Sequence, residues 1–425
     1  MTAPRVTYRY VAPTLSVLTR NRDFRYLFLA QLVVFGGDWF ALIPLITLLQ
    51  QLTDSGLPGA LALTADTAVG ALVLPFAGTL ADRFDRRWLM IVANAGTMAA
   101  IALLFAVQSA AAAWIGPVAI GLAAAAKSFY TPAAGAALPN VVDEADLPAA
   151  NALGGSAWGT MLVVGASLGG VMSQAFSPYV CFAVDLVCLA LAAVLVWLVR
   201  RPMQADRNGV PAARPIKALA DALRYIRREP RVLSLVTVKS GVGVGNGVLA
   251  VFPVISTLVF AIGPIGTGLL FAARGFGALI GPLLFRRVLG HRSWLMPGLA
   301  VSMVSYGLAY LGVAVSSWFW LALGLVVVAH VAGGGNWVMS NYALQIEVPD
   351  HLRGRVFATD MMIATLAISA SLLVAGFLVD VNPRIPIAIC GGLTVAYGIV
   401  WRLATRRIMR TSAAAMPSPA PAPAA

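Results

Sequence analysis

Long apolar runs separated by short polar segments dominate the pattern along this chain. A helix that crosses the hydrocarbon core of a bilayer needs about 20 mostly apolar residues. Several of the runs are separated by only a few residues, so consecutive helices are expected to lie antiparallel. Windows of this length predict twelve membrane-spanning helices, at residues 24–49, 58–80, 88–108, 112–135, 151–176, 178–200, 231–260, 264–286, 293–314, 317–344, 356–379 and 384–403.

The positions of the basic residues test this prediction, because cytoplasmic loops carry an excess of Lys and Arg. If the N-terminus is cytoplasmic, 26 of the 30 Lys and Arg residues fall in cytoplasmic segments. Arg384 falls on the opposite side, and Lys127, Lys239 and Arg274 fall within predicted spans. We therefore predict a multi-pass protein of the cytoplasmic membrane with both termini in the cytoplasm.

Composition agrees with insertion into a membrane. Of the 425 residues, 60% are hydrophobic and 11% are charged, whereas about a quarter of the residues of a soluble domain are charged. So few charges disfavour a soluble enzyme or a disordered scaffold. The basic residues that give the chain its net charge of +13 lie between the apolar runs. This distribution reflects membrane topology and not a nucleic-acid-binding face. The lipid bilayer is therefore an expected partner, and nucleic acid is not.

A basic central segment divides the chain into two halves. Its candidate surface helix at 216–226 either lies on the anionic inner leaflet or is a solvated linker helix. The predicted organisation is a cytoplasmic N-terminal arm (1–23), a six-helix bundle (24–200), a basic cytoplasmic linker (201–230), a second six-helix bundle (231–403) and a cytoplasmic Ala/Pro-rich tail (404–425).

The two halves resemble each other at a spacing of 203 to 206 residues. Segment 78–90 has a counterpart at 281–296, and segment 138–144 has one at 344–350. Parallel repeats with a binding site between them are an architecture of secondary transporters. The predicted fold is therefore an all-α integral membrane protein, with twelve transmembrane helices in two pseudo-symmetric six-helix bundles.

Residues 78–87 resemble the loop signature of the major facilitator superfamily, G-x-L-a-D-r-x-G-r-r, with Asp85 where glycine is usual. In that family the aspartate and the arginines form a charge relay that gates the alternation of the two halves. The second-half copy lacks the acidic residue. The resemblance implies the major facilitator fold and assigns this gating role to Gly78, Asp82, Arg83, Arg86 and Arg87.

Residues 165–170 are similar to the G-P-x-x-G-G signature of the family's antiporters, with Ala166 in place of the proline. Gly165, Gly169 and Gly170 match the motif. Other segments resemble the branch of enterobactin and macrolide exporters among the drug-efflux permeases: Phe24-Arg25, Gly36-Gly37-Asp38, 138–152 and 353–358. The resemblance implies efflux, with multidrug resistance as one form of it.

Charged residues inside the first-half spans are candidates for function, because a charge at the bilayer centre costs about 2.5–3.5 kcal/mol. At 1.5 Å per residue, Asp38 lies about 20 Å from the cytoplasmic end of its span and Lys127 about 12 Å from its own, and an outstretched lysine covers most of that difference. We expect Asp38 to bind the coupling proton and Lys127 to modulate it. The alternatives are a structural ion pair, or a lysine that reaches the cytoplasmic interface. Asp66 is either a gate or cavity residue, or solvated near the outer mouth. Asp185 is expected to be peripheral.

The second half offers Arg274, near mid-depth, which is expected to pair with a carboxylate or to contact an anionic substrate. Four further positions are weaker candidates. Lys239 is expected to reach the cytoplasmic interface and Asp360 to lie near a helix N-terminus, where the dipole favours an anion. His330 is either a proton relay or a packing residue, and Asn336 follows glycines 333–335, which are expected to loosen the helix and expose carbonyls.

These patterns together predict a secondary active transporter that exports a small amphipathic drug, siderophore or secondary metabolite by alternating access, driven by inward proton flow. Uptake or flipping of a metabolite or lysophospholipid stays open, as does a transport-inactive sensor or scaffold. The sequence contains no motif of an enzyme or of a metal site. We expect no metal and no cofactor beyond the proton gradient, and a monomer whose partners are lipid, substrate and protons.

Overall fold

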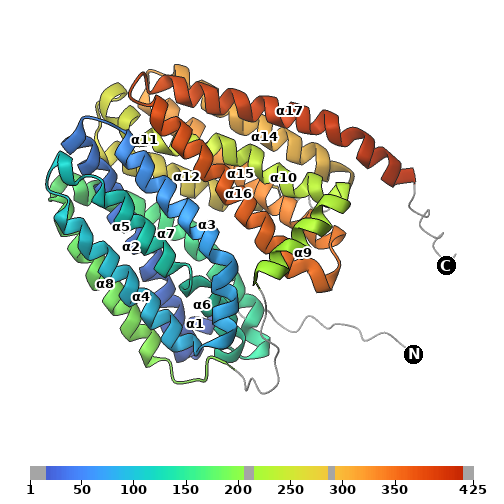
Figure 1. The fold of residues 1–425 in the computed structure, drawn as a ribbon, viewed down its shortest axis with the longest axis horizontal. Coiled ribbons are helices and arrows are strands. Elements are labelled where there is room, and N and C mark those ends of the chain that lie inside the picture. The colour runs from blue at the N-terminus through green and yellow to red at the C-terminus, as the bar shows by residue number, and fades with distance from the viewer. Residues whose placement is uncertain (1–15, 205–214, 286–291, 415–425) are drawn as a thin grey trace.

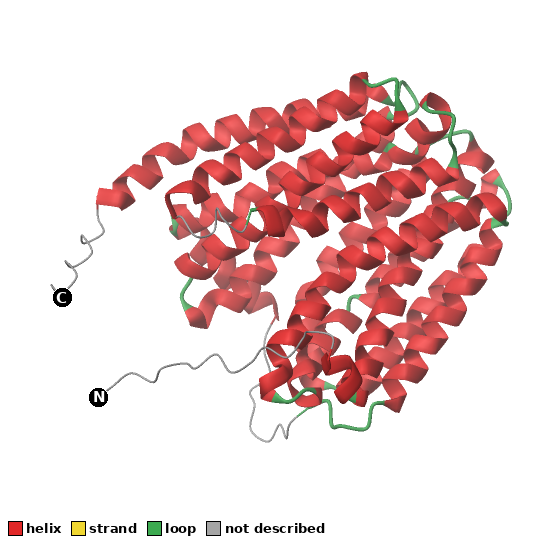
Figure 2. Ribbon diagram, turned by 180° about the vertical axis from the view of Figure 1, so that it is seen from behind, coloured by secondary structure: helices red, strands yellow, loops and turns green. Residues whose placement is uncertain are grey.

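The computed structural model describes residues 16–204, 215–285 and 292–414, and the regular structure among them is helical (Figures 1 and 2). The first half comprises α1 (Ser16–Arg20), α2 (Arg22–Thr53), α3 (Leu57–Arg83), α4 (Arg86–Ala102), α5 (Ile115–Lys127), α6 (Tyr130–Val141), α7 (Leu147–Ala175) and α8 (Pro178–Leu198). The second half, after α9 (Pro215–Arg228), comprises α10 (Pro230–Gly245), α11 (Phe252–Val254), α12 (Pro264–Leu284), α14 (Arg292–Val315), α15 (Phe319–Glu347), α16 (Asp350–Leu378) and α17 (Arg384–Ala414).

The predicted spans agree with these helices. Within the described residues, eleven helical segments are long and apolar enough to cross a membrane. The remaining expected span, 151–176, corresponds to α7, a helix of 29 residues. α7 packs against α2 on one side and against α12 on the other. The prediction of an all-helical membrane protein is thereby confirmed.

Local signals set where the helices begin and end. The Asn21 side chain accepts a hydrogen bond from Phe24 N at 2.9 Å and caps α2, as short polar side chains do at helix N-termini. Asp85 accepts from Trp88 N at 3.0 Å and caps α4 in the same way. The aspartate that departs from the family's usual glycine therefore starts a helix.

Two expected spans are not continuous helices. The fourth span divides into α5 and α6 at Ser128 and Phe129. Pro132 explains the break, because it has no N–H to donate to the Ser128 carbonyl and its ring crowds that carbonyl. The seventh span passes from α10 through a 3₁₀ turn at Asn246–Ala250 and α11 into a π-helical turn at Ile255–Val259.

One helix boundary and the surroundings of one helix differ from the expected ones. α17 continues to Ala414, past the expected end of the last span at 403. α9 forms where a surface helix was expected, but its apolar side chains Ala222 and Ile226 are buried, and it packs against α16, α10 and α3. That face is therefore docked on the protein and faces neither lipid nor open water.

The glycines at 333–335 do not loosen their helix, so that expectation was wrong. α15 runs unbroken from Phe319 to Glu347. The glycines instead admit close neighbours: a Cβ atom on Gly334 would lie 2.8 Å from the Ala278 carbonyl oxygen of α12. Gly281 of α12 is equally crowded by α15, since its Cβ would lie 2.9 Å from Gly335 N. The small residues serve close helix packing.

The two halves meet closely at the end of the molecule opposite α9. Gly170 of α7 and Gly268 of α12 face each other there, and a Cβ on either would lie 3.0 Å from the other's Cα. Asp380, just after α16, accepts hydrogen bonds from Ser55 Oγ at 2.5 Å and from Gly56 N at 2.7 Å. In both ribbon views the two bundles diverge from this closed end toward the end where α9 lies.

Candidate transport site

Three helices of the first half bring a cluster of charges together. The Nζ atom of Lys127 on α5 lies 2.9 Å from Asp38 Oδ2 on α2 and 3.6 Å from Asp66 Oδ1 on α3. Lys127 is the last residue of α5, where the helix dipole favours a cation. The expected proximity of Asp38 and Lys127 is confirmed, and Asp66, which was considered separately, joins them. Their roles in transport stay predictions.

A cavity of about 100 Å³ adjoins this cluster. One water needs roughly 10–15 Å³ of such space, so the cavity has room for several water molecules. It is smaller than the roughly 300 Å³ at which pockets for drug-sized ligands begin. In this conformation the charges therefore face a space suited to water and protons. The cavity is lined by Phe35, Asp38, Trp39, Ala41, Leu42, Asp66, Thr97, Ile101, Ile120, Ala123, Lys127 and Trp158.

Asp185 of α8 is a buried carboxylate that the sequence analysis placed at the periphery. Its exposed fraction is 2%, and its Oδ1 atom has no hydrogen-bond partner within the described residues. It lies against Gly37, where any added Cβ would collide with the carboxylate. In the sequence, the two glycines immediately before Asp38 could have indicated that a neighbouring helix packs closely there, because small residues permit such an approach.

The glycines of the antiporter-like motif lie against the segment of α2 that carries Asp38. A Cβ on Gly165 would lie 2.7 Å from the Gly36 carbonyl oxygen, and one on Gly169 would lie 3.0 Å from the Trp39 carbonyl oxygen. Gly170 contacts the second half through Gly268. The motif therefore fixes how closely α7 packs on α2 and α12, while its link to antiport stays a prediction.

Arg274 of α12 lies between the two halves. Its Cζ atom is 5.7 Å from the ring centroid of Trp39 on α2 and 5.6 Å from that of Trp158 on α7. Trp39 also packs on Phe271, with 5.4 Å between ring centroids. Within the described residues no carboxylate lies in ion-pair range of Arg274, so the expected carboxylate partner is not found.

Lys239 and Asp360 form a buried ion pair in the second half, with exposed side-chain fractions of 2% and 1%. Lys239 Nζ also donates to Asn341 Oδ1 at 2.7 Å and lies 4.9 Å from the Trp337 ring centroid. Both expectations for this pair were wrong. α16 begins at Asp350, so Asp360 lies too deep to cap it, and the pairing draws Lys239 inward, away from the interface.

His330 and Asn336 lie in the packed interior of the second half. His330 Nε2 shares a hydrogen bond of 2.8 Å with the Tyr310 hydroxyl. Asn336 Nδ2 donates to Ser302 Oγ at 2.9 Å. Both side chains are buried, and neither lines the cavity described above. These contacts favour packing as the role of His330 over a proton relay.

The arginines of the gating signature contact the start of the linker. One guanidinium nitrogen of Arg86 donates to the Ala136 carbonyl at 2.7 Å and to the Met203 carbonyl at 3.0 Å. Arg87 donates to the Arg201 carbonyl at 3.4 Å. Arg83 is exposed, whereas the surroundings of Gly78 and the side chain of Asp82 lie outside the described part of the structure. The expected relay through Asp82 therefore stays a prediction.

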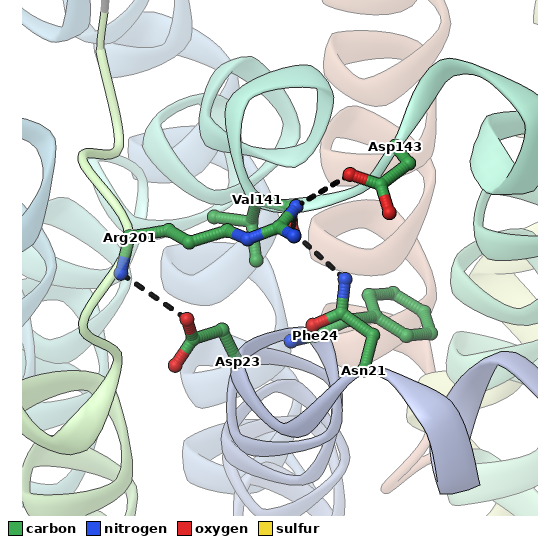
Figure 3. A network of polar contacts seen from close by, with 6 residues as sticks. All are labelled: Asn21, Asp23, Phe24, Val141, Asp143 and Arg201. Carbon is green, nitrogen blue, oxygen red and sulfur yellow. Dashed lines mark hydrogen bonds and ion pairs between the residues drawn. The ribbon is translucent and has the colours of Figure 1, made fainter.

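Figure 3 shows how the linker start is tied to the first half. Arg201 donates to the Val141 carbonyl at 3.1 Å and to Asp143 Oδ1 at 2.8 Å, and its backbone N–H donates to Asp23 Oδ2 at 3.2 Å. Asn21 Nδ2 donates to the same Val141 carbonyl at 3.0 Å. Together with Arg86 and Arg87, these bonds hold residues 200–203 against α2, α4 and α6.

Replacing Arg86 by Gln is expected to loosen this anchor. A hydrogen bond to a charged group contributes about 1.5–3 kcal/mol, so the loss favours local opening of residues 200–203 by roughly tenfold or more. Limited digestion with trypsin measures this as faster cleavage after Arg200 and Arg201. The control is Arg22→Gln, whose exposed side chain bonds only to Tyr26 among the described residues; equal cleavage rates in both variants would contradict the prediction.

No group of three or more His, Cys, Asp or Glu side chains is placed to hold a metal ion in the described ranges. The site instead consists of carboxylates and one ammonium at a small cavity, with a guanidinium and two indole rings beside it. Such an arrangement can bind and release protons and present a cation and aromatic faces to a ligand.

Comparison with known proteins relates the chain to membrane transporters. Residues 13–423 match the family model MFS_3, described as transmembrane secretion effector. An uncharacterised MFS-type transporter of Mycobacterium tuberculosis is 26% identical over 81% of this chain and 85% of its own length. Macrolide efflux protein A of Streptococcus pyogenes is 22% identical over 72% of this chain and 76% of its own length.

Solved structures share the fold at low sequence identity. A bacterial homologue of the human lysosomal transporter Spinster, in an inward-facing and unoccupied conformation, has a TM-score of 0.74 at 15% identity and covers 94% of this chain and 99% of its own. The nucleoside transporter NupG has a TM-score of 0.70 at 15% identity, with coverage of 91% and 99%.

Proposed function

The chain belongs to the major facilitator superfamily of membrane transporters, and on this premise we propose that it is a proton-coupled exporter of small amphipathic compounds. The observation that carries the proposal is the cluster of Asp38, Asp66 and Lys127 beside a cavity that has room for water. The similarity to macrolide efflux protein A supports export as the direction.

The balance of charges explains why this cluster suits a proton. Asp38, Asp66 and the neighbouring Asp185 are three carboxylates around the single ammonium of Lys127. Like charges in a medium of low dielectric repel strongly, so a bound proton relieves the excess of negative charge. Binding or release of that proton changes the attraction among α2, α3 and α5, which is the coupling that a secondary transporter requires.

The asymmetry between the two ends of the molecule supports alternating access as the mechanism. The halves touch at the Gly170–Gly268 contact and through Asp380, and they diverge toward α9. We place α9 and both termini in the cytoplasm of a bacterial cell, because the basic residues gather on that side. The described conformation then opens inward, and one chain supplies both halves, so it acts as a monomer.

The proton gradient is sufficient as an energy source. Moving one elementary charge across 100 mV is worth about 2.3 kcal/mol, so a single proton that enters the cell supports the export of a compound against its concentration. Asp38 alternates between a protonated form and a form paired with Lys127, and the transport cycle needs no cofactor.

Accumulation of dyes and antibiotics, a macrolide included, in an efflux-deficient bacterium tests this function. Expression of the chain is expected to lower accumulation several-fold, and both a protonophore and Asp38→Asn are expected to abolish the effect. Asp54→Asn is the matched control, because Asp54 is exposed at the end of the same helix and asparagine tolerates its left-handed backbone. Full protonophore-sensitive export by Asp38→Asn would show that Asp38 is not the coupling site.

A further inference from the structure

Arg274 is a cation at the junction of the two halves whose surroundings call for an anion. Its guanidinium carries five N–H donors, and none of them is hydrogen-bonded to any of the described residues. Its contacts are instead the ring faces of Trp39 and Trp158. Cation–π contacts offset only part of the cost of placing an arginine inside a membrane. An anionic ligand that accepts hydrogen bonds from these donors would offset more of it.

The neighbouring groups suit an aromatic ligand next to that cation. Trp39 and Trp158 line both the cavity and the guanidinium, which places apolar ring faces beside the charge. Arg274 itself is only partly covered. The cavity of about 100 Å³ beside the two rings has room only for water in this conformation, so an aromatic ligand requires a conformation in which the halves leave a wider space there.

The carboxylates of the neighbouring helices already lie beside other cations. Asp38 and Asp66 both lie within ion-pair range of Lys127, and Asp360 pairs with Lys239. Among the described cations Lys127, Lys239 and Arg274 within the spanning helices, Arg274 is therefore the one without a carboxylate in ion-pair range. Its planar fork of donors matches a carboxylate in two parallel hydrogen bonds.

We propose that Arg274 binds the carboxylate of the transported compound while Trp39 and Trp158 hold its aromatic body, so that the substrates are amphipathic aromatic acids. This inference rests on the proposed transport function and specifies its substrate class. It assigns a different role to each half: the acidic cluster of the first half binds and releases protons, and the guanidinium of the second half binds the substrate.

Equilibrium binding to the purified full chain in detergent tests the proposal. Three probes share one aromatic body and differ in charge: 2-naphthoate, methyl 2-naphthoate and 2-naphthylmethylamine. Calorimetric titrations, corrected by titration into empty micelles, are expected to give 2-naphthoate a dissociation constant at least tenfold lower than those of the ester and the amine. This arm requires no variant, so it does not depend on whether a mutant folds.

Variants locate the preference on Arg274. Arg274→Gln is expected to raise the dissociation constant of 2-naphthoate at least tenfold and to leave that of the ester unchanged, and Arg274→Lys is expected to fall between. Arg22→Gln, which removes one positive charge from an exposed site, is the matched control. Size-exclusion chromatography before each titration verifies that the variant is folded and monodisperse.

Three outcomes would overturn the inference: no binding of 2-naphthoate, equal or tighter binding of the amine, or unchanged binding of 2-naphthoate to Arg274→Gln. The titrations contain no proton gradient, so they are independent of the coupling mechanism. A missing preference for the acid alongside export that depends on Asp38 would remove the substrate class and leave the proposed function standing. A preference for the acid without such export would remove the proposed function alone.

Discussion

Replacing Lys127 by Met is expected to lower the free energy of unfolding by about 3 kcal/mol, because it leaves carboxylates in the membrane interior without their counter-charge. Removing one partner of a buried ion pair typically costs about 3–5 kcal/mol. The side chains of Lys127 and Asp38 are 25% and 26% exposed to the cavity, and water there screens part of the penalty, so the lower end applies. Unfolding in mixed micelles of rising SDS content measures the change.

A compensating substitution separates charge imbalance from lost packing. Lys127→Met combined with Asp38→Asn is expected to recover most of the stability, because the second change removes the carboxylate that lies 2.9 Å from the ammonium. Lys217→Met on the exposed face of α9 is the control, with an expected change within about 0.5 kcal/mol. A double variant no more stable than Lys127→Met would contradict the electrostatic explanation.

Replacing Asp360 by Leu is expected to cost about 3–5 kcal/mol, since it strands the Lys239 ammonium in a site where only 2% of that side chain is exposed. The remaining contacts of Lys239, with Asn341 and Trp337, do not supply a negative charge. The double variant Lys239→Met/Asp360→Leu is expected to be at least as stable as the parent, because apolar replacements of a buried pair are often neutral or stabilising.

The same unfolding assay measures the stability of the single and double variants of this pair. Asp221→Leu is the matched control, because Asp221 pairs with Arg224 on the surface of α9, where an ion pair contributes about 0–1 kcal/mol. If Asp360→Leu alone were as stable as the parent protein, the pair would not be the electrostatic partnership that the structure shows. A double variant that failed to recover would point to a loss of packing instead.

The sequence predicted the helices of the bundle well because membrane insertion depends on local properties. An apolar run of sufficient length is a spanning helix wherever it packs, and basic residues mark one side. Helix arithmetic left a difference in depth between Asp38 and Lys127 that an extended lysine could cover, and the structure joins the two side chains. Breaks were harder to predict: Pro132 divides the fourth span, although prolines elsewhere, such as Pro44 in α2, leave their helices intact.

The parts of the site that the sequence did not predict depend on which sides of the helices pack against one another. Asp185 was assigned to the periphery, yet α8 turns it toward Gly37 of α2. The pairing of Lys239 with Asp360 joins residues 121 positions apart, and nothing local to either residue indicates the other. Arg86 was interpreted through a family resemblance as part of a relay, whereas it also holds backbone carbonyls of residues 136 and 203.

The contact between Gly170 and Gly268 restricts how this protein can evolve. A Cβ atom on either glycine would lie 3.0 Å from the other's Cα, so even alanine at one position pushes the two halves apart at the end where they close. A change there is tolerated only together with a shift of α7 or α12, which several neighbouring positions must accommodate at once. Lineages that keep this closed state are therefore expected to retain both glycines, while the residues that contact substrates diverge freely.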